Sequence, residues 1–242
     1  MKLTSNAWST YPTYLSYPTY LSYPTYPSYL SYSCPVPVHL IDHPIAHDAL
    51  RALRDKDTRP SHFRRLAHRL SLLLAIEATR DLGMKASPVD TPLERTEGRE
   101  LASDVVVVPV LRAGLGMVEA VLELLPQARV GHIGLQRDER TAVASQYYAK
   151  LPPDLSASIA LIVDPMLATG GSAVSAIRML NDAGARDVRL VCIVAAPEGI
   201  AAVEAARPDV RIFTPVIDRG LNASKFILPG LGDFGDRLYA TT

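Results

Sequence analysis

The segment ALIVDPMLATGGS, residues 160–172, joins an apolar run, a single acid and a glycine-rich turn. An uninterrupted apolar run before Asp164 is typical of a strand that is covered on both faces. The small residues from Ala168 to Ser172 let successive backbone N–H groups converge on one anion at the start of a helix. The segment therefore predicts a strand, a phosphate-binding loop and a helix, as in a doubly wound α/β fold.

The kind of phosphate follows from what this loop contains. A Walker loop requires the pattern GxxxxGK[ST], and no lysine follows the glycines here, so a terminal monophosphate fits better than a nucleoside triphosphate. A ribose 5-phosphate held by its phosphate would bring its 2′- and 3′-hydroxyls near Asp164. The alternative is an ordinary helix N-cap that follows a strand.

Other segments extend the same alternation of strands and helices. Residues 104–110 (DVVVVPV) and 188–196 (VRLVCIVAA) are further apolar runs, and 129–134 is strand-like. Helical spacing is found in residues 47–56, 61–82, 116–124, 172–183 and 198–206. Gly184 stands just past one of these helices, where a C-terminal glycine belongs. We expect a doubly wound, mainly parallel sheet with N-terminal helices and ligands at the carboxyl ends of the strands.

Composition sets broad limits on partners and location. The 242 residues carry 25 basic and 25 acidic side chains, which argues against a general nucleic-acid binder. No apolar run approaches 18 residues, so no membrane span is expected. Cys34 and Cys192 form no metal-binding pattern and fit free thiols in a reducing cytoplasm.

The N-terminal 35 residues differ from the rest. They repeat YPTYLS and then degrade into YPTYPSYLSYS, with a proline in every repeat. Proline at that spacing disfavours a helix, and we expect a disordered or polyproline-like tail (1–35) before a single domain (36–242). A translation start near Val36 or Val38 is a hypothesis that an intact-mass measurement would test.

Further candidates follow other predicted strands. Arg112 precedes Ala113 and Gly114, so its guanidinium would lie beside backbone that a phosphate can approach closely. The charged segment 134–148 is expected to be an exposed, mobile loop, with Arg137 as a second cation that closes over a polyphosphate. The glycine-rich C-terminal segment 226–241 is expected to be a loop.

Two acids in that C-terminal segment have different expected roles. Asp233 could bind a magnesium-loaded substrate or orient a base, whereas Asp236 is expected to be a structural cap. Arg64 and the arginines near it on the same helical segment are expected to form a solvated or oligomer-facing surface.

Five motifs together resemble one known family. In order they are VPVLRAGLGM, ALIVDPMLATGGS, VAAPEGI, IDRGLN and PGLGDFGDRL. From about Val38 to Thr242 the chain resembles the uracil phosphoribosyltransferases, a type I phosphoribosyltransferase family. The resemblance implies that uracil and 5-phospho-α-D-ribose 1-diphosphate (PRPP) are converted to UMP and diphosphate. Mg²⁺ would be carried by PRPP rather than by a protein metal site, and some relatives respond to GTP and form dimers or tetramers.

The resemblance also implies roles for individual residues. Catalysis would involve Asp164, Arg137 and Asp233. PRPP would be bound by Arg112, Arg137, Asp164, Pro165, Met166, Leu167, Ala168, Thr169, Gly170, Gly171, Ser172 and Asp233. Uracil would be bound by Ile227, Gly232, Asp233 and Phe234.

The chain also departs from the family pattern. Phe234 stands where alanine is usual, Gln136 where tyrosine is usual, and residues 223–226 (Ala-Ser-Lys-Phe) replace a Glu-His-Gly-Tyr-like stretch. Three alternatives stay open: a phosphoribosyltransferase for another nucleobase, an RNA-binding pyrimidine-operon regulator on the same fold, and an inactive scaffold that uses its tail as a ligand. The neutral charge disfavours the RNA-binding alternative.

Overall fold

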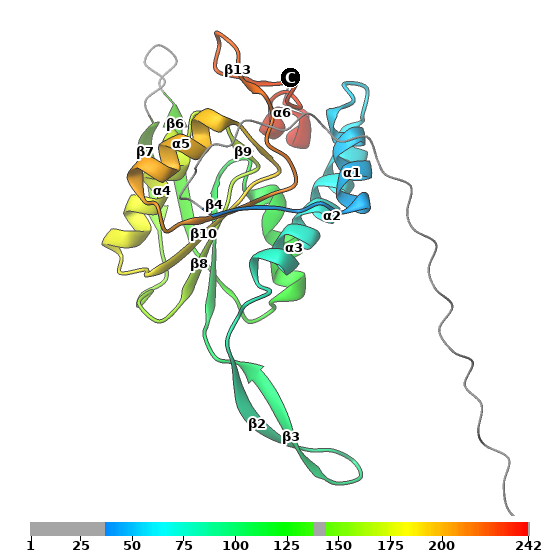
Figure 1. Cartoon of the computed structure of the whole chain (residues 1–242), viewed down its shortest axis with the longest axis vertical. Coiled ribbons are helices and arrows are strands. Elements are labelled where there is room, and N and C mark those ends of the chain that lie inside the picture. The colour runs from blue at the N-terminus through cyan, green and yellow to red at the C-terminus, as the bar shows by residue number, and fades with distance from the viewer. Residues whose placement is uncertain (1–36, 138–143, 242) are drawn as a thin grey trace, which may run out of the picture. The chain divides into compact units, whose positions relative to one another are not determined.

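The computed structural model of the chain describes residues 37–137 and 144–241 (Figure 1). The tail predicted for residues 1–35 lies outside the described residues, and so does the stretch 138–143 of the predicted mobile loop. Cys34 lies outside them too, whereas Cys192 is a buried free thiol.

A central sheet forms the middle layer, as predicted. Its strand order is β1-β12-β10-β8-β4-β6-β7, and β5 also pairs with β4. The bounds are β1 Val38–Leu40, β12 Arg211–Thr214, β10 Asp187–Val191, β8 Ile159–Val163, β4 Val105–Leu111, β5 Arg129–Val130, β6 His132–Arg137 and β7 Ala144–Lys150. Every pair is parallel except β6 with β7. The prediction of a mainly parallel α/β sheet is confirmed.

Helices cover both faces of this sheet (Figure 1). On one side lie α1 (Pro44–Arg54), α2 (Pro60–Ala78) and α3 (Leu115–Leu124), and α2 contacts β10 and β12. On the other side lie α4 (Gly171–Asp182) and α5 (Pro197–Ala206), which contact each other, and α4 also contacts β8. No helix within the described ranges is long and apolar enough to cross a membrane.

The two cores explain the unbroken apolar runs. In β4, Val105 and Val107 pack into the core under α1 to α3, whereas Val106 and Val108 pack into the core under α4 and α5. Since successive strand residues point to opposite faces, a strand with helices on both sides must be apolar at every position. Each such valine stabilises the fold by about 1.5–3 kcal/mol of transfer free energy.

Several expected elements differ from the structure. Most of the charged segment 134–148 belongs to the antiparallel strands β6 and β7, because their backbone groups pair with each other despite the polar side chains. The expected strand 188–196 ends early as β10 and continues, after a break, as β11 (Val194–Ala195), which pairs with β9 (Met166–Leu167). The C-terminal segment is a loop only in part, because α6 (Phe234–Tyr239) begins directly after Asp233.

A two-stranded hairpin has no counterpart among the predicted elements. Strands β2 (Met84–Asp90) and β3 (Arg95–Leu101) pair antiparallel, and the hairpin extends away from the sheet and its helices (Figure 1). Its sequence is largely polar and exposed, so it lacks the periodicity that identifies a half-buried strand.

Candidate active site

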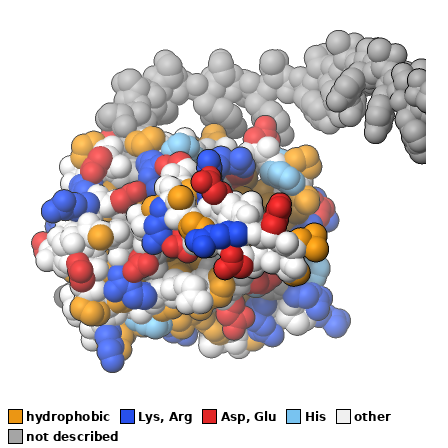
Figure 2. All heavy atoms as spheres, turned by 90° about the horizontal axis from the view of Figure 1, so that it is seen from below, with side chains coloured by type: hydrophobic (Ala, Val, Ile, Leu, Met, Phe, Trp, Pro, Cys, Tyr) orange, Lys and Arg blue, Asp and Glu red, His pale blue; other side chains and the backbone are white. Residues whose placement is uncertain are grey.

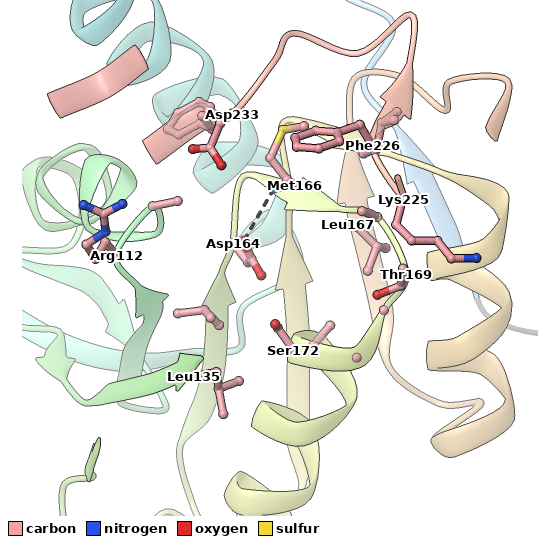
Figure 3. A pocket seen from close by; sticks show the side chains of 18 of the residues that line it. Arg112, Leu135, Asp164, Met166, Leu167, Thr169, Ser172, Lys225, Phe226 and Asp233 are labelled. Atoms are coloured by element: carbon pink, nitrogen blue, oxygen red, sulfur yellow. Dashed lines mark hydrogen bonds between the residues drawn. The ribbon is translucent and has the colours of Figure 1, made fainter. Parts of the chain in front are cut away.

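One cavity opens at the carboxyl edge of the sheet. Its volume is about 290 Å³, and the ends of β4 and β8 form its floor. Because these strands are parallel and adjacent, with Pro109 opposite Val163, the residues that follow them emerge side by side. Arg112 and Asp164 are those residues, and both line the cavity (Figure 3).

Arg112 provides positive charge at one side of the cavity. Its side chain is 61% exposed, and its Nη2 lies 3.3 Å from Oδ1 of Asp236. The phenol of Tyr239 donates to the Arg112 carbonyl oxygen at 3.3 Å. Both partners belong to α6, so this helix orients the arginine. Asp236, which was expected to be only a cap, therefore also contacts a cation of the site.

Asp164 lies at the centre of the cavity floor (Figure 3). Burial raises the pKa of its carboxyl to about 7, and the backbone N–H of Met166, 3.5 Å from Oδ1, offsets this only in part. An ion pair with Asp164 is absent from the described part of the chain. A carboxyl in this state is ready to accept hydrogen bonds from hydroxyl groups of a ligand.

The glycine-rich loop predicted between β8 and α4 is present. Gly170 has a φ of +80° and is the N-cap of α4, so the loop turns sharply there. Gly171 and Ser172 of the first turn line the cavity, and the first N–H groups of a helix have no partner within the helix. A Cβ on Gly170 would lie 2.9 Å from the Gly199 carbonyl oxygen and 2.7 Å from Ala202 Cβ. The loop therefore rests directly on α5, which fixes its shape.

A second loop forms the opposite wall. It begins with a short hairpin of β13 (Gly220–Leu221) and β14 (Ile227–Leu228) and continues to Asp233. The backbone N–H of Gly230 donates to Asp218 at 2.9 Å, and its carbonyl oxygen accepts from Arg54 at 2.8 Å. Arg237 donates to the Leu231 carbonyl oxygen at 2.7 Å. Side chains from α1 and α6 thus hold the backbone of this wall.

Asp233 and Phe234 end that wall. The Asp233 carboxylate caps α6 by accepting from the N–H of Asp236 at 2.9 Å, while the residue also lines the cavity. Phe234 is 1% exposed, and its ring packs edge to face on Phe63 of α2 with ring centroids 5.1 Å apart. The bulky ring at this position therefore fills the core beneath α6, and the change from alanine affects the packing of that helix.

The cavity brings together most of the residues predicted for the site. Those that line it are Arg112, Asp164, Met166, Leu167, Ala168, Thr169, Gly170, Gly171, Ser172, Ile227, Gly232, Asp233 and Phe234. Pro165 does not line it. Arg137 ends β6, but its side chain lies outside the described part of the chain.

Sequence reasoning missed two residues of the wall and one contact of a surface arginine. Lys225 and Phe226 line the cavity directly before Ile227, and their departure from the family pattern was the signal that could have identified them. Arg64 is exposed as expected, yet its guanidinium donates to the Leu238 carbonyl oxygen at 2.8 Å. This arginine therefore anchors the C-terminal helix.

The comparison with known proteins agrees with this geometry. A family model described as uracil phosphoribosyltransferase matches residues 40–241. The chain belongs to the uracil phosphoribosyltransferase family. The uracil phosphoribosyltransferase of Symbiobacterium thermophilum is 49% identical over 205 residues, which are 84% of this chain and 98% of that protein. That of Clostridium tetani is 50% identical over 202 residues, or 83% and 97% of the two chains.

A solved structure supports the same assignment. The structure of the AQ2163 protein from Aquifex aeolicus matches with a TM-score of 0.82 and 36% identity, and the match covers 85% of this chain and 99% of that one. The uracil phosphoribosyltransferase family resemblance drawn from the five motifs is confirmed. The matched range includes every residue that lines the cavity.

Proposed function

We propose that this protein is a uracil phosphoribosyltransferase that converts uracil and PRPP to UMP and diphosphate in pyrimidine salvage. The observation that carries the proposal is one cavity, in a member of this family, that is lined by Arg112, Asp164 and the loop at the start of α4. In this assignment the loop binds the 5′-phosphate, Asp164 accepts from the ribose hydroxyls, and Arg112 faces the diphosphate. The wall from Ile227 to Phe234 receives uracil.

The reaction needs charge stabilisation rather than a protein nucleophile. Departure of diphosphate leaves positive charge on the ribose ring and adds negative charge to the leaving oxygens, while a uracil nitrogen attacks the anomeric carbon. Fixed donors aimed at the leaving group supply several kcal/mol in such reactions. Arg112, held by Asp236, provides one of them at 3.3 Å from its anchor. Arg137 is proposed to provide another, and Asp233 is proposed to face the donor as well.

Mg²⁺ belongs to the proposal as a partner of PRPP. Among the described residues there is no group of three or more His, Cys, Asp or Glu side chains that could hold a metal ion. Mg²⁺ in phosphoryl sites commonly keeps several waters and takes one or two carboxylates together with substrate phosphates. The cavity fits this arrangement, because Asp164 and Asp233 are the carboxylates that line it. When bound, Mg²⁺ would neutralise charge on the leaving diphosphate.

One assay tests the proposal. The full chain is incubated with PRPP, uracil and Mg²⁺, and UMP and diphosphate are both quantified. Equal amounts of the two products are expected. Competition among uracil, cytosine and hypoxanthine then tests the base, and preferential use of another base would replace uracil in the proposal while keeping the donor.

An RNA-binding role on the same fold receives no support from the face that Figure 2 shows. Figure 2 shows basic and acidic side chains interspersed on one face, with no continuous basic area. The chain as a whole carries 25 basic and 25 acidic residues. A regulator of RNA would need a basic patch for the phosphate backbone. RNA binding that falls with salt, without turnover of PRPP, would revive this alternative.

Self-association and location complete the proposal. We propose a homo-oligomer in the cytoplasm, with GTP as an activator to be tested in the same assay. The projecting hairpin supports self-association, because Leu93 at its turn is 95% exposed and Val89 is 48% exposed. The two-stranded sheet β2-β3 also leaves the outer edge of each strand without a neighbouring strand, and such an edge can pair with another chain.

A further inference from the structure

Lys225 occupies an unusual backbone conformation at the rim of the cavity. Its φ is +65°, in the left-handed region that favours glycine, and it is one of three non-glycine residues with positive φ in the described part of the chain. Of these three, Lys225 alone lines the cavity. A side chain kept in a strained conformation at a binding site is a reason to ask what that side chain contributes.

The backbone around Lys225 is firmly held. Its N–H donates to the Asn222 carbonyl oxygen at 2.9 Å, and the Asn222 side chain accepts from the N–H of Phe226 at 2.9 Å. The N–H of Leu221 donates to Glu198 of α5 at 3.0 Å. The hairpin that carries Lys225 is therefore fastened to α5, the same helix on which the phosphate-binding loop rests.

The Lys225 ammonium has no acidic partner among residues 37–137 and 144–241. Its exposed side chain lies above Thr169, on the side of the cavity opposite Arg112, and its Nζ extends outward, away from Asp164 (Figure 3). The stretch from Thr169 to Ser172 itself contains no charged side chain, so its attraction for an anion comes from N–H groups, hydroxyls and the helix dipole. Because Lys225 lines the same cavity as this loop, rotation about its side-chain torsions would bring a full positive charge to a loop that provides only partial ones.

We propose that Lys225 binds the 5′-phosphate of the phosphoribosyl donor, as a side-chain cation that complements the backbone phosphate loop. This inference rests on the proposed function, because it takes PRPP as the ligand. The two cations at opposite sides of the cavity match a donor that carries phosphate at both ends. Arg112 serves the diphosphate end and Lys225 the monophosphate end.

The test separates the two ends of the donor. Wild type and Lys225→Gln are titrated by calorimetry with PRPP, with ribose 5-phosphate and with inorganic pyrophosphate. Lys225→Gln is expected to weaken binding of ribose 5-phosphate by about threefold to tenfold, the range for one exposed charged contact, and to change pyrophosphate binding less than twofold. Lys225→Arg is expected to retain most of the affinity. Wild-type affinity is expected to fall more steeply with ionic strength than that of Lys225→Gln.

A matched control uses Arg186→Gln. Arg186 is exposed directly before β10, at the amino edge of the sheet, so its loss removes one positive charge far from the cavity. All three affinities are expected to stay unchanged in this variant. Equal losses for ribose 5-phosphate and pyrophosphate in Lys225→Gln, or no loss for either, would overturn the role of Lys225. A wild-type protein that binds no PRPP would overturn the proposed function itself.

Lys225→Gly provides an independent readout. Glycine adopts a φ of +65° without strain, so the Tm of this variant is expected to stay the same or to rise by up to about 2 °C. Its affinity for ribose 5-phosphate is expected to fall as much as that of Lys225→Gln. Loss of binding without loss of stability distinguishes a ligand contact from a structural one. A Tm that falls together with affinity would contradict the inference.

Discussion

Arg54 of α1 forms a two-pronged ion pair with Asp218, with Nη1 2.9 Å from Oδ2 and Nη2 2.7 Å from Oδ1. The same Nη1 donates to the Gly230 carbonyl oxygen at 2.8 Å, and Asp218 accepts from the Gly230 N–H at 2.9 Å. The pair therefore binds both the N–H and the carbonyl oxygen of Gly230, a residue of the proposed uracil wall. Asp218 is only 5% exposed, so the carboxylate side of this ion pair is buried.

Arg54→Ala is expected to destabilise the protein by about 2–4 kcal/mol, because it leaves a buried carboxylate unpaired. Since Arg54 acts on the wall and not on the substrate, KM for uracil should rise by about tenfold while KM for PRPP changes little. Chemical denaturation and steady-state kinetics measure the two effects. Arg80→Ala is the control, because Arg80 pairs with Glu77 on the surface with 69% of its side chain exposed. A KM for PRPP that rises as much as that for uracil would contradict the positioning role.

Asp164→Asn should remove most of the activity, with kcat/KM for PRPP reduced by about 100-fold or more, because an amide accepts fewer hydrogen bonds from the ribose diol. Asp104→Asn is a suitable control, because this carboxylate precedes β4 at the opposite edge of the sheet and is 80% exposed. Comparable kcat/KM values for the two variants would remove Asp164 from the mechanism.

The same substitution should stabilise the fold at alkaline pH. Burial raises the pKa of Asp164 from 3.8 to about 7 in the folded state. Below pH 3.8 the carboxyl is protonated in both states and its burial costs no charge desolvation. As pH rises from 3.8 through 7, the free energy of unfolding falls, because the unfolded state ionises first. The difference between the two pKa values corresponds to a loss of at most about 4 kcal/mol in the free energy of unfolding, at 1.36 kcal/mol per pKa unit. The Tm of Asp164→Asn relative to wild type should be several degrees higher at pH 8 than at pH 5, and a constant difference would count against this account.

The pKa of about 7 for Asp164 also predicts how activity depends on pH. PRPP binds best to the ionised carboxylate, so kcat/KM for PRPP should rise about tenfold between pH 6 and pH 8 and then level off. Measurement at saturating uracil isolates the donor. The step should be absent from the residual activity of Asp164→Asn, and its survival there would assign the titration to another group.

Gly170→Ala tests the close packing of the phosphate loop on α5. The φ of +80° is strained for any residue with a Cβ. The added Cβ would also lie 2.7 Å from Ala202 Cβ and 2.9 Å from the Gly199 carbonyl oxygen. A loss of about 2–4 kcal/mol in stability and weaker PRPP binding are expected. Gly184→Ala is a matched control, since its φ is +92° but no atom lies within 4 Å of the added Cβ. That variant should lose about 1 kcal/mol and keep its affinity for PRPP.

The hairpin prediction concerns self-association. Leu93→Asp and Val89→Asp together place charge on the exposed arm and should shift the oligomer measured by light scattering toward a smaller species. Thr91→Asp is the control on the same turn, because Thr91 is already a polar, exposed residue. An unchanged molar mass in the double variant would exclude the arm as the contact.

Local patterns predicted the centre of the fold and the core of the site. The uninterrupted apolar run before Asp164 predicts a strand covered on both faces, and the structure places β8 (Ile159–Val163) there with every residue buried. The loop before α4 was recognisable because small residues and a helix start act over a few neighbouring positions. Gly184 likewise follows α4 with a φ of +92°, as its position indicated.

The features that escaped prediction depend on long-range pairing. The polar strands β6 and β7 form because they pair with each other, and Arg54 meets Asp218 across 164 residues of sequence. The residues that surround Arg54 and Asp218 in the sequence do not indicate that these two side chains pair. The residue type of Lys225 does not indicate its positive φ, and the signal came from the family resemblance, because Lys225 stands where the Glu-His-Gly-Tyr-like stretch has glycine.

Three side chains from separate parts of the chain form hydrogen bonds with the backbone between Asp218 and Asp233. They are Arg54 in α1, Glu198 in α5 and Arg237 in α6. None of them lines the cavity. The tip of this stretch can therefore be substituted to accept a different base or donor, while the three side chains that hold its backbone are kept. Directed evolution of this enzyme would do best to randomise residues 223–226 and leave those three side chains untouched.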